Sequence, residues 1–389
     1  MRWFVGAANV FTCFILLTSS VLAQRTNPDA SLRGSINEID KRPVIIIQAT
    51  TPKRPNPAAD QVRADGALPS KEQLNNGIVT VITAPVGGAY AAMGSDMAAV
   101  LDDGDSLRVL PVIGKGSVQN LIDILRLKSI DMGFVLSDAL EFVKTEYGVR
   151  NIESEVNYIT KVFNADVHIL ARKEIGTIRD LTGKTVYAQR NLGYATVRNL
   201  FNRLGIKANV DFNTDDVIGL QKVLTGVGDA WAGPIGKVAP ILRNIKNEEG
   251  QFHLVSIPYE KAIQDLYFPS SITSGDYPNL VPAGEIVQTV AVSSLLVAYN
   301  WPPGSDRFNR VARFVDALFS KIDQLQQPMR HPKWQETTIS AAMPGLQRFK
   351  AAEDWLAQRA RAAEVKSVPQ ADQTELYKQF LDWRRANKR

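Results

Sequence analysis

Short apolar runs alternate with segments of helical periodicity from residue 78 onward. Apolar, β-branched runs predict strands at 78–84, 107–113 and 131–135. Between them, apolar residues recur at the spacing of a helix that is buried on one side. These residues are Met93, Met97, Val100 and Leu101 in the first segment, and Val118, Leu121, Ile122 and Leu125 in the second. The pattern predicts a βαβαβ unit, which builds a parallel sheet with ligand sites at the carboxyl ends of its strands.

A second α/β unit follows, without any sequence repeat of the first. Its expected strands are Val167–Arg172, Thr185–Gln189, Val210–Phe212 and Asp229–Gly233. Its expected helices are a short one at 178–184, one with Val197, Leu200, Phe201 and Leu204 on one face, and Val217–Leu224. The stretch Gln288–Tyr299 is one more apolar run. The remainder is helical, and we interpret two further apolar stripes as core: Phe308, Val311, Val315, Leu318 and Ile322, then Leu376, Phe380 and Trp383.

The first 23 residues are typical of an export signal. Arg2 precedes an apolar run at 11–17, and small residues precede an expected cut after Ala23. This run is shorter than the ~20 residues of a membrane-spanning helix, although an uncleaved anchor is the alternative. Cys13, the one cysteine, lies inside this segment, so the exported chain would contain no thiol. Residues 24–76 are proline-rich and polar, and we expect an extended, linker-like segment there.

Composition and missing motifs narrow the class of function. The chain of 389 residues is 45% hydrophobic and 22% charged, as in ordinary globular proteins. The net charge of +5 forms no basic stripe with aromatic residues, so nucleic acid is not an expected partner. No nucleophile elbow, phosphate-binding glycine loop or zinc-protease helix occurs, and we expect no cofactor and no metal. His168 alternates with apolar residues in a strand, which favours a structural histidine over a catalytic base.

Two loops rich in small residues stand where expected strands meet helices. They are Pro85–Tyr90, with Gly87, Gly88 and Ala89, and Gly114–Ser117, with Gly116 and then Val118. Backbone N–H groups at the start of a helix can hold an anion such as a carboxylate, and glycine allows a close approach. Ser117 could add a hydroxyl donor. The alternative is a pair of ordinary turns in which Ser117 only caps its helix.

The second unit offers a comparable loop, Gln189–Thr196. Arg190 could pair with a carboxylate through two hydrogen bonds, unless it is a solvated surface residue. Tyr90, Tyr194 and Trp231 could form the wall of an apolar pocket, and core packing is the alternative for Trp231.

Several of these blocks together resemble the TAXI family, the extracytoplasmic solute receptors of TRAP transporters. The resemblance covers residues 77–350, and the order and spacing of the blocks agree. The blocks are 85–94, 114–121, 130–138, 166–173, 178–186, 226–234, 299–305 and 331–334. It implies a type II periplasmic-binding-protein fold, an α/β fold of two lobes joined by two crossing strands. Lobe one would comprise 77–165 plus 290–389 and lobe two 166–289, with the hinge near 165–167 and 289–292.

The resemblance also implies a function without catalysis. Such a receptor captures a small organic anion, an amino acid or carboxylate, in the periplasm and delivers it to a TRAP-type membrane permease. The second-lobe loop departs from the Gly-Ser-Gly-Thr block of many members, so we expect a ligand other than glutamate. The expected ligand-binding residues are Gly87, Gly88, Ala89, Tyr90, Gly116, Ser117, Val118, Ser137, Asp138, Gln189, Arg190, Gly193, Tyr194, Thr196 and Trp231. An exported enzyme or a sensor partner on the same scaffold is the alternative.

Overall fold

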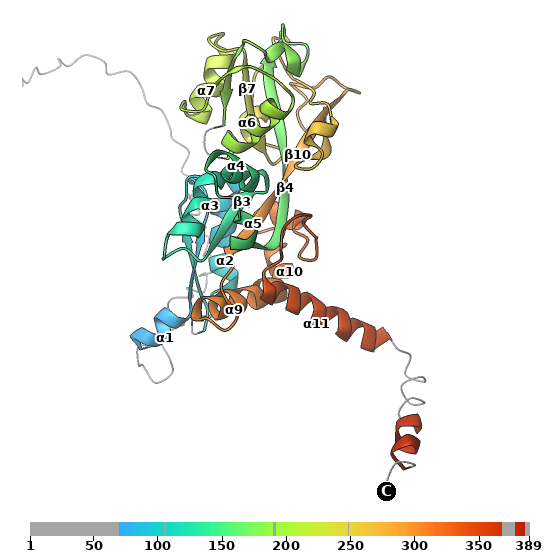
Figure 1. Ribbon diagram of the computed structural model, residues 1–389. Coiled ribbons are helices and arrows are strands. Elements are labelled where there is room, and N and C mark those ends of the chain that lie inside the picture. The colour runs from blue at the N-terminus through green and yellow to red at the C-terminus, as the bar shows by residue number, and fades with distance from the viewer. Residues whose placement is uncertain (1–69, 105, 190–191, 248, 368–377, 386–389) are drawn as a thin grey trace, which may run out of the picture. The chain divides into compact units, whose positions relative to one another are not determined.

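The computed structural model describes residues 70–104, 106–189, 192–247, 249–367 and 378–385 (Figure 1). By its contacts the chain divides into two compact parts, residues 1–54 and 55–389, and all described residues belong to the second part. The expected signal peptide and residues 24–69 of the expected linker lie outside the described residues. Residues 71–76 of that linker form a short helix, α1 (Lys71–Asn76), and are not extended. This stretch contains lysine, glutamate, glutamine and leucine but no proline, which favours a helix.

The first predicted βαβαβ unit is confirmed. It consists of β1 (Ile78–Ile82), α2 (Ala89–Leu101), β2 (Arg108–Val112), α3 (Ser117–Arg126) and β3 (Met132–Leu136). Strand β1 lies between β2 and β3 and is parallel to both. The carboxyl ends of all three strands therefore meet at one edge of the sheet, where α2 and α3 begin.

The second unit is also confirmed, but its first strand is longer than expected. Strand β4 runs from Val156 to Arg172, so the predicted Val167–Arg172 is only its last part. Strand β5 (Thr185–Ala188) lies between β6 (Asn209–Asp211) and β7 (Ala230–Ile235) and is parallel to both. Helix α6 (Gly193–Arg203) follows β5, and α7 (Asp216–Leu224) follows β6. Two strands, β8 (Phe252–Leu254) and β9 (Phe268–Thr273), were not predicted, because β8 has only three residues and β9 contains a proline and two serines.

Two long strands connect the units. Strand β10 (Ile286–Tyr299) pairs antiparallel with β4, and the sheet order is β2-β1-β3-β10-β4-β7-β5-β6. Asp166 on β4 is paired with Ala291 of β10 on one side and with Ile235 of β7 on the other. Beyond this point β4 pairs with β7, and β10 pairs with β9. Two α/β units joined by two strands are the topology of the predicted fold class, which is therefore confirmed. The residue limits of the two lobes stay a prediction.

The remaining helices cover these units. They are α4 (Asp138–Glu146), α5 (Ile152–Glu155), α8 (Pro240–Arg243), α9 (Asp306–Ser320), α10 (Ile322–Leu325), α11 (Lys350–Ser367) and the 3-10 helices η1 (Ile178–Leu181), η2 (Lys261–Ile263) and η3 (Pro332–Glu336). Helix α9 packs on β1 and α2, and α11 packs on α9. The apolar face of α9 is buried as predicted, through Val311, Val315 and Leu318. Phe380 and Trp383 are instead 50% and 62% exposed, so the interpretation of that stripe as core was wrong.

Candidate ligand-binding site

A buried asparagine holds the carboxyl ends of the first unit's strands together. The Asn120 side chain donates hydrogen bonds to the carbonyl oxygens of Thr83, 2.5 Å, and Phe134, 2.8 Å. Gly114 lies directly against it, and a Cβ there would collide with Asn120 Oδ1 and Ile82. Asn120 thus fixes the loops after β1 and β2 with respect to β3. The sequence contained one signal for this role, a polar residue between Val118 and Leu121 on the apolar face of a helix.

The two predicted glycine loops begin helices as expected. Gly87 has a φ of 97° and Gly116 a φ of 118°, which side chains other than glycine rarely adopt. Gly88 precedes Ala89, the first residue of α2, and its N–H donates to the Pro85 carbonyl oxygen. No side chain caps either helix by a hydrogen bond. The first-turn N–H groups of α2 and α3 therefore point from the same edge of the sheet, and anion binding there stays a prediction.

Ser117 does not cap its helix, so the capping role in that alternative was wrong, while ordinary turns stay an alternative to anion binding. Its buried hydroxyl accepts a hydrogen bond from the backbone N–H of Leu136 at 3.0 Å and thereby joins α3 to β3. Val118 next to it belongs to the core beneath α3 and α4. Both residues position the loop, and their contact with a ligand stays a prediction.

Tyr90 lies in the core under the first loop. Its ring stacks on Phe134, with 4.8 Å between centroids and 11° between planes, and it also contacts Phe163 on β4. The ring is 2% exposed, yet its hydroxyl has no hydrogen-bond partner among the described residues. Burial raises the pKa of Tyr90, and the nearby Ser294 hydroxyl partly offsets this effect. Tyr90 is therefore a neutral hydroxyl that faces the strand joining the two units.

Asp138, the first residue of α4, is buried between the two units. Its Oδ2 accepts a hydrogen bond from the Tyr267 hydroxyl at 3.0 Å, and its carbonyl oxygen accepts one from Asn199 of α6 at 3.1 Å. Its Oδ1 has no partner among the described residues. Burial raises the pKa of Asp138 from its ordinary 3.8 to about 6, and the Thr196 and Tyr267 hydroxyls partly offset this effect. Ser137 beside it is half-buried, and its N–H donates to the Ser293 carbonyl oxygen.

The loop after β5 reaches the first unit directly. Tyr194 packs edge-on against Phe142 of α4, 5.0 Å between centroids, and against Phe212, 4.5 Å. Gly193 lies so close to Gln189 and Pro234 that a Cβ would not fit without movement. The Thr196 hydroxyl is buried without a partner among the described residues. The start of α6 therefore touches α4 through several of the predicted residues.

Two predicted residues remain. Arg190, the proposed carboxylate partner, lies outside the described residues. Trp231 is 1% exposed and packs in the core with Leu170 and Tyr187, as the alternative for it stated.

Unpartnered polar atoms gather where β4 and β10 connect the units. Among the described residues, they include atoms on both sides of the junction and on the connecting strands: Tyr90 Oη, Asp138 Oδ1, Asn164 Oδ1, Gln189 Oε1, Thr196 Oγ1, Ser293 Oγ and Ser294 Oγ. Leaving such an atom buried without a hydrogen bond costs about 1–3 kcal/mol. Buried polar atoms of this kind can be satisfied by a bound solute or by water.

His168 has the structural role predicted for it. It lies on β4, fully buried, where its Nδ1 donates to the Asp166 carbonyl oxygen at 2.8 Å and its Nε2 accepts from the Tyr277 hydroxyl at 3.0 Å. Burial lowers the pKa of His168 to about 4, so the ring is neutral at ordinary pH. Within the described part of the chain, no group of three or more potential ligands could hold a metal ion.

Lys333 on η3 was missed by the sequence analysis. Its Nζ donates to the Lys237 carbonyl oxygen at 3.0 Å, pairs with Glu336 and lies over the ring of Phe163. Its side chain is only 12% exposed, and a Cβ at Gly236 would collide with it. Because Lys237 follows β7 and Phe163 lies on β4, this lysine holds the turn after β7 against the connecting strand.

Comparisons with known proteins find only distant similarities to this chain. No protein-family model matches it, and no curated protein matches it either. Among solved structures it is similar to a mutant of ArgBP from T. maritima, with 13% identity, 68% of this chain and 97% of that chain covered, and a TM-score of 0.40. It is also similar to the GluR0 ligand-binding core of Nostoc punctiforme in complex with L-glutamate, with 13% identity, coverage of 66% and 95%, and a TM-score of 0.39.

A Xanthomonas citri protein bound to ATP gives 10% identity, coverage of 74% and 98%, and a TM-score of 0.43. Likenesses this distant carry no argument about ligand or activity, so the assignment of the fold rests on the sheet topology. Among the described residues, no helix combines the length and the apolar character that crossing a bilayer needs.

Proposed function

We propose that this protein is an extracytoplasmic receptor that binds a small amino acid or carboxylate between two α/β lobes. The observation that carries this proposal is the group of buried, unpartnered polar atoms at the junction of the two units. They lie beside the connecting strands β4 and β10, where a hinge would let the units open and close. A solute that enters the open form would satisfy these atoms when the units close over it, and binding would shift the equilibrium toward the closed form.

The chemistry of these atoms favours an amino acid over a simple carboxylate. Gln189 Oε1 is a hydrogen-bond acceptor, and Asp138 Oδ1 is one when its carboxyl is ionised. The solute could supply donors to both atoms, in addition to the Thr196 hydroxyl beside Asp138. An ammonium group supplies three donors and a compensating positive charge. The solute's carboxylate would then lie at the first turns of α2 and α3, whose N–H groups are available to an anion. Tyr90, Thr196 and Gly193 would complete the enclosure.

The resemblance to TAXI receptors and the expected export signal extend this proposal. The receptor would act in the periplasm, after cleavage behind Ala23, and would deliver its solute to a TRAP-type permease. No residue of the proposed site acts on the solute, which is bound and released unchanged. An exported enzyme on the same scaffold is the second candidate, and chemical change of the solute distinguishes the two.

Native mass spectrometry of the purified protein tests this function. We expect an added mass that corresponds to one small amine-bearing acid and that disappears when the protein is denatured. The released compound is then incubated with fresh protein and analysed again, and we expect it to be recovered unchanged. Recovery of a chemically converted product would support the second candidate, an exported enzyme. Absence of any co-purified solute, together with no binding across a panel of amino acids and carboxylates, would contradict the receptor.

A further inference from the structure

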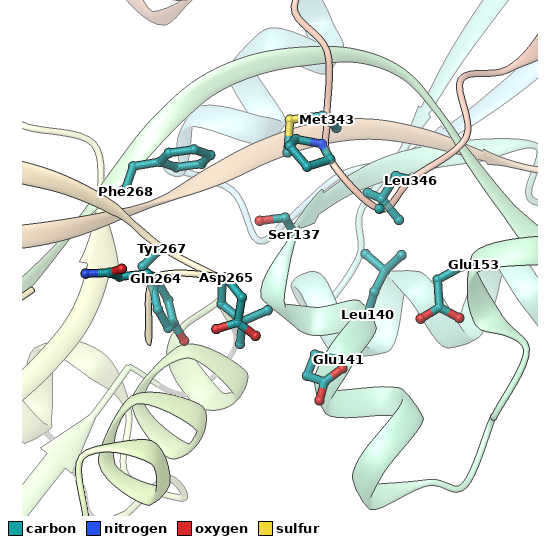
Figure 2. Close-up of a pocket in the computed structure, with 13 residues that line it drawn as sticks. Ser137, Leu140, Glu141, Glu153, Gln264, Asp265, Tyr267, Phe268, Met343 and Leu346 are labelled. Carbon is teal, nitrogen blue, oxygen red and sulfur yellow. The ribbon is translucent and has the colours of Figure 1, made fainter. Parts of the chain in front are cut away.

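A separate cavity of about 460 Å³ lies beside the proposed site. Three stretches line it: Ser137–Glu141 together with Glu153 from the first unit, Gln264–Phe268 before β9, and Met343–Leu346 (Figure 2). Of the predicted ligand-binding residues, only Ser137 borders it. Its volume falls within the range of about 300–1,000 Å³ that small-molecule sites occupy.

Part of the lining of this cavity is apolar. Met343 is 8% exposed, while Phe268 keeps 40% of its surface exposed, and Leu140, 4% exposed, lies next to Glu141 and Glu153 (Figure 2). Met343 and Phe268 are grouped on the same side of the cavity, as Figure 2 shows. Lys161, which does not border the cavity, lies with its Nζ 5.5 Å from the centroid of the Phe268 ring. Covering the exposed part of this ring with an apolar group is favourable.

The lining also carries a surplus of negative charge. Glu141, Glu153 and Asp265 border the cavity. Arg203 pairs with both Glu141, 3.8 Å, and Asp265, 2.7 Å, while Lys144 pairs with Glu153 at 2.7 Å. Three carboxylates thus share two cations, and all these pairs are partly exposed, where ion pairs are weak. A positively charged group that enters the cavity is therefore attracted, and an anion is repelled.

We propose that this cavity binds a small amphipathic ammonium ion, with its apolar body against Met343 and Phe268 and its head among the three carboxylates. The proposal does not depend on the function of the neighbouring site. The two sites are adjacent, because Ser137 borders the cavity and Tyr267, which also lines it, donates its hydroxyl to Asp138. Since the lining comes from both α/β units, an occupant also bridges them.

Three eight-carbon probes of equal length test the charge preference: octylammonium, octanol and octanoate, titrated into the full chain by calorimetry at pH 8. We expect octylammonium to bind at least tenfold more tightly than octanol, and octanoate to bind most weakly. Equal affinity for octylammonium and octanol would overturn the proposal, because the carboxylates would then contribute nothing.

Two variants locate the binding. Leu346→Trp fills the cavity and should abolish octylammonium binding, while Glu153→Gln should weaken it at least threefold without occupying space. The matched control is Glu285→Gln, an exposed glutamate before β10 that does not border the cavity. Circular dichroism confirms that each variant is folded. Octylammonium binding that survives Glu153→Gln and Leu346→Trp unchanged, with both variants folded, would also overturn the proposal.

Discussion

Replacing Asp138 with asparagine should stabilise the protein and impair its binding. The Asp138 carboxyl has a pKa of about 6 in the folded protein, above its ordinary 3.8, chiefly because burial penalises the charged form. A group of this kind favours folding fully below its unfolded pKa, and the contribution is lost as the pH rises through about 6. The difference in pKa corresponds to about 3 kcal/mol of free energy of unfolding that the wild type forgoes at pH 8.

Asparagine is almost the same size, and its Oδ1 can still accept the Tyr267 hydrogen bond. We therefore expect Asp138→Asn to unfold with a free energy up to about 3 kcal/mol higher than the wild type at pH 8. The advantage should shrink toward zero near pH 4, where the wild-type carboxyl is protonated. Urea denaturation at pH 4, 6 and 8, followed by fluorescence and circular dichroism, measures this difference.

The same variant should lose affinity for an amine-bearing solute. Removing a charge-assisted hydrogen bond costs about 1.5–3 kcal/mol, which is about ten- to a hundredfold in Kd. A variant that is less stable than the wild type at pH 8, by an amount that does not change with pH, would refute the reasoning. That result would mean that the folded protein fully compensates the carboxylate and that Oδ1 needs no further partner.

Three further predictions concern residues around the site. Lys333→Met removes the hydrogen bond to the Lys237 carbonyl oxygen and should raise the Kd for the solute about tenfold through faster dissociation. Stopped-flow kinetics measures the dissociation rate, and Lys350→Met, at an exposed lysine, is the control. Equal dissociation rates in the two variants would contradict the role of Lys333. Asn120→Ala removes the two hydrogen bonds to the Thr83 and Phe134 carbonyl oxygens and should lower the free energy of unfolding by about 2–4 kcal/mol in urea. A change within ~0.5 kcal/mol would show that the loops need no such link. The pKa of His168 is about 4 in the folded protein, below its ordinary 6.5, so the contribution of this histidine to stability is fully present above pH 6.5 and is lost as the pH falls toward 4. His168→Gln should therefore lose less stability than the wild type between pH 7 and 4. An equal loss in the variant and the wild type would contradict this role of His168.

The sequence predicted the elements whose apolar pattern is regular. In β1 and β3, apolar runs stand between glycine or polar turns, and the helices α3 and α9 each have one apolar face. The first half of β4 was missed because Asn157, Lys161 and Asn164 interrupt its pattern, although most of the strand is buried. A strand whose two faces are both covered by other elements does not need regular alternation.

The candidate site was predictable only where it lies on local motifs. The glycine loops and the start of α6 are visible as strand-to-helix turns, and they do begin helices. Tyr267 lies 129 residues from its partner Asp138, and Lys333 lies 96 residues from Lys237. No spacing rule connects such pairs, because only the packing of the two units brings them together. Trp231 shows that a local motif can also mislead. It follows a pair of glycines in the sequence, but it packs in the core with Leu170 and Tyr187.

Calorimetric titration with amino acids and their deaminated carboxylate analogues, compared between wild type and Asp138→Asn, tests the central claim most directly. We predict one solute per chain with a Kd of about micromolar or tighter, preference for the amine-bearing member of a pair, and at least tenfold weaker binding by the variant. No measurable heat with any compound, or equal affinities for wild type and variant, would contradict solute binding at the junction of the two units.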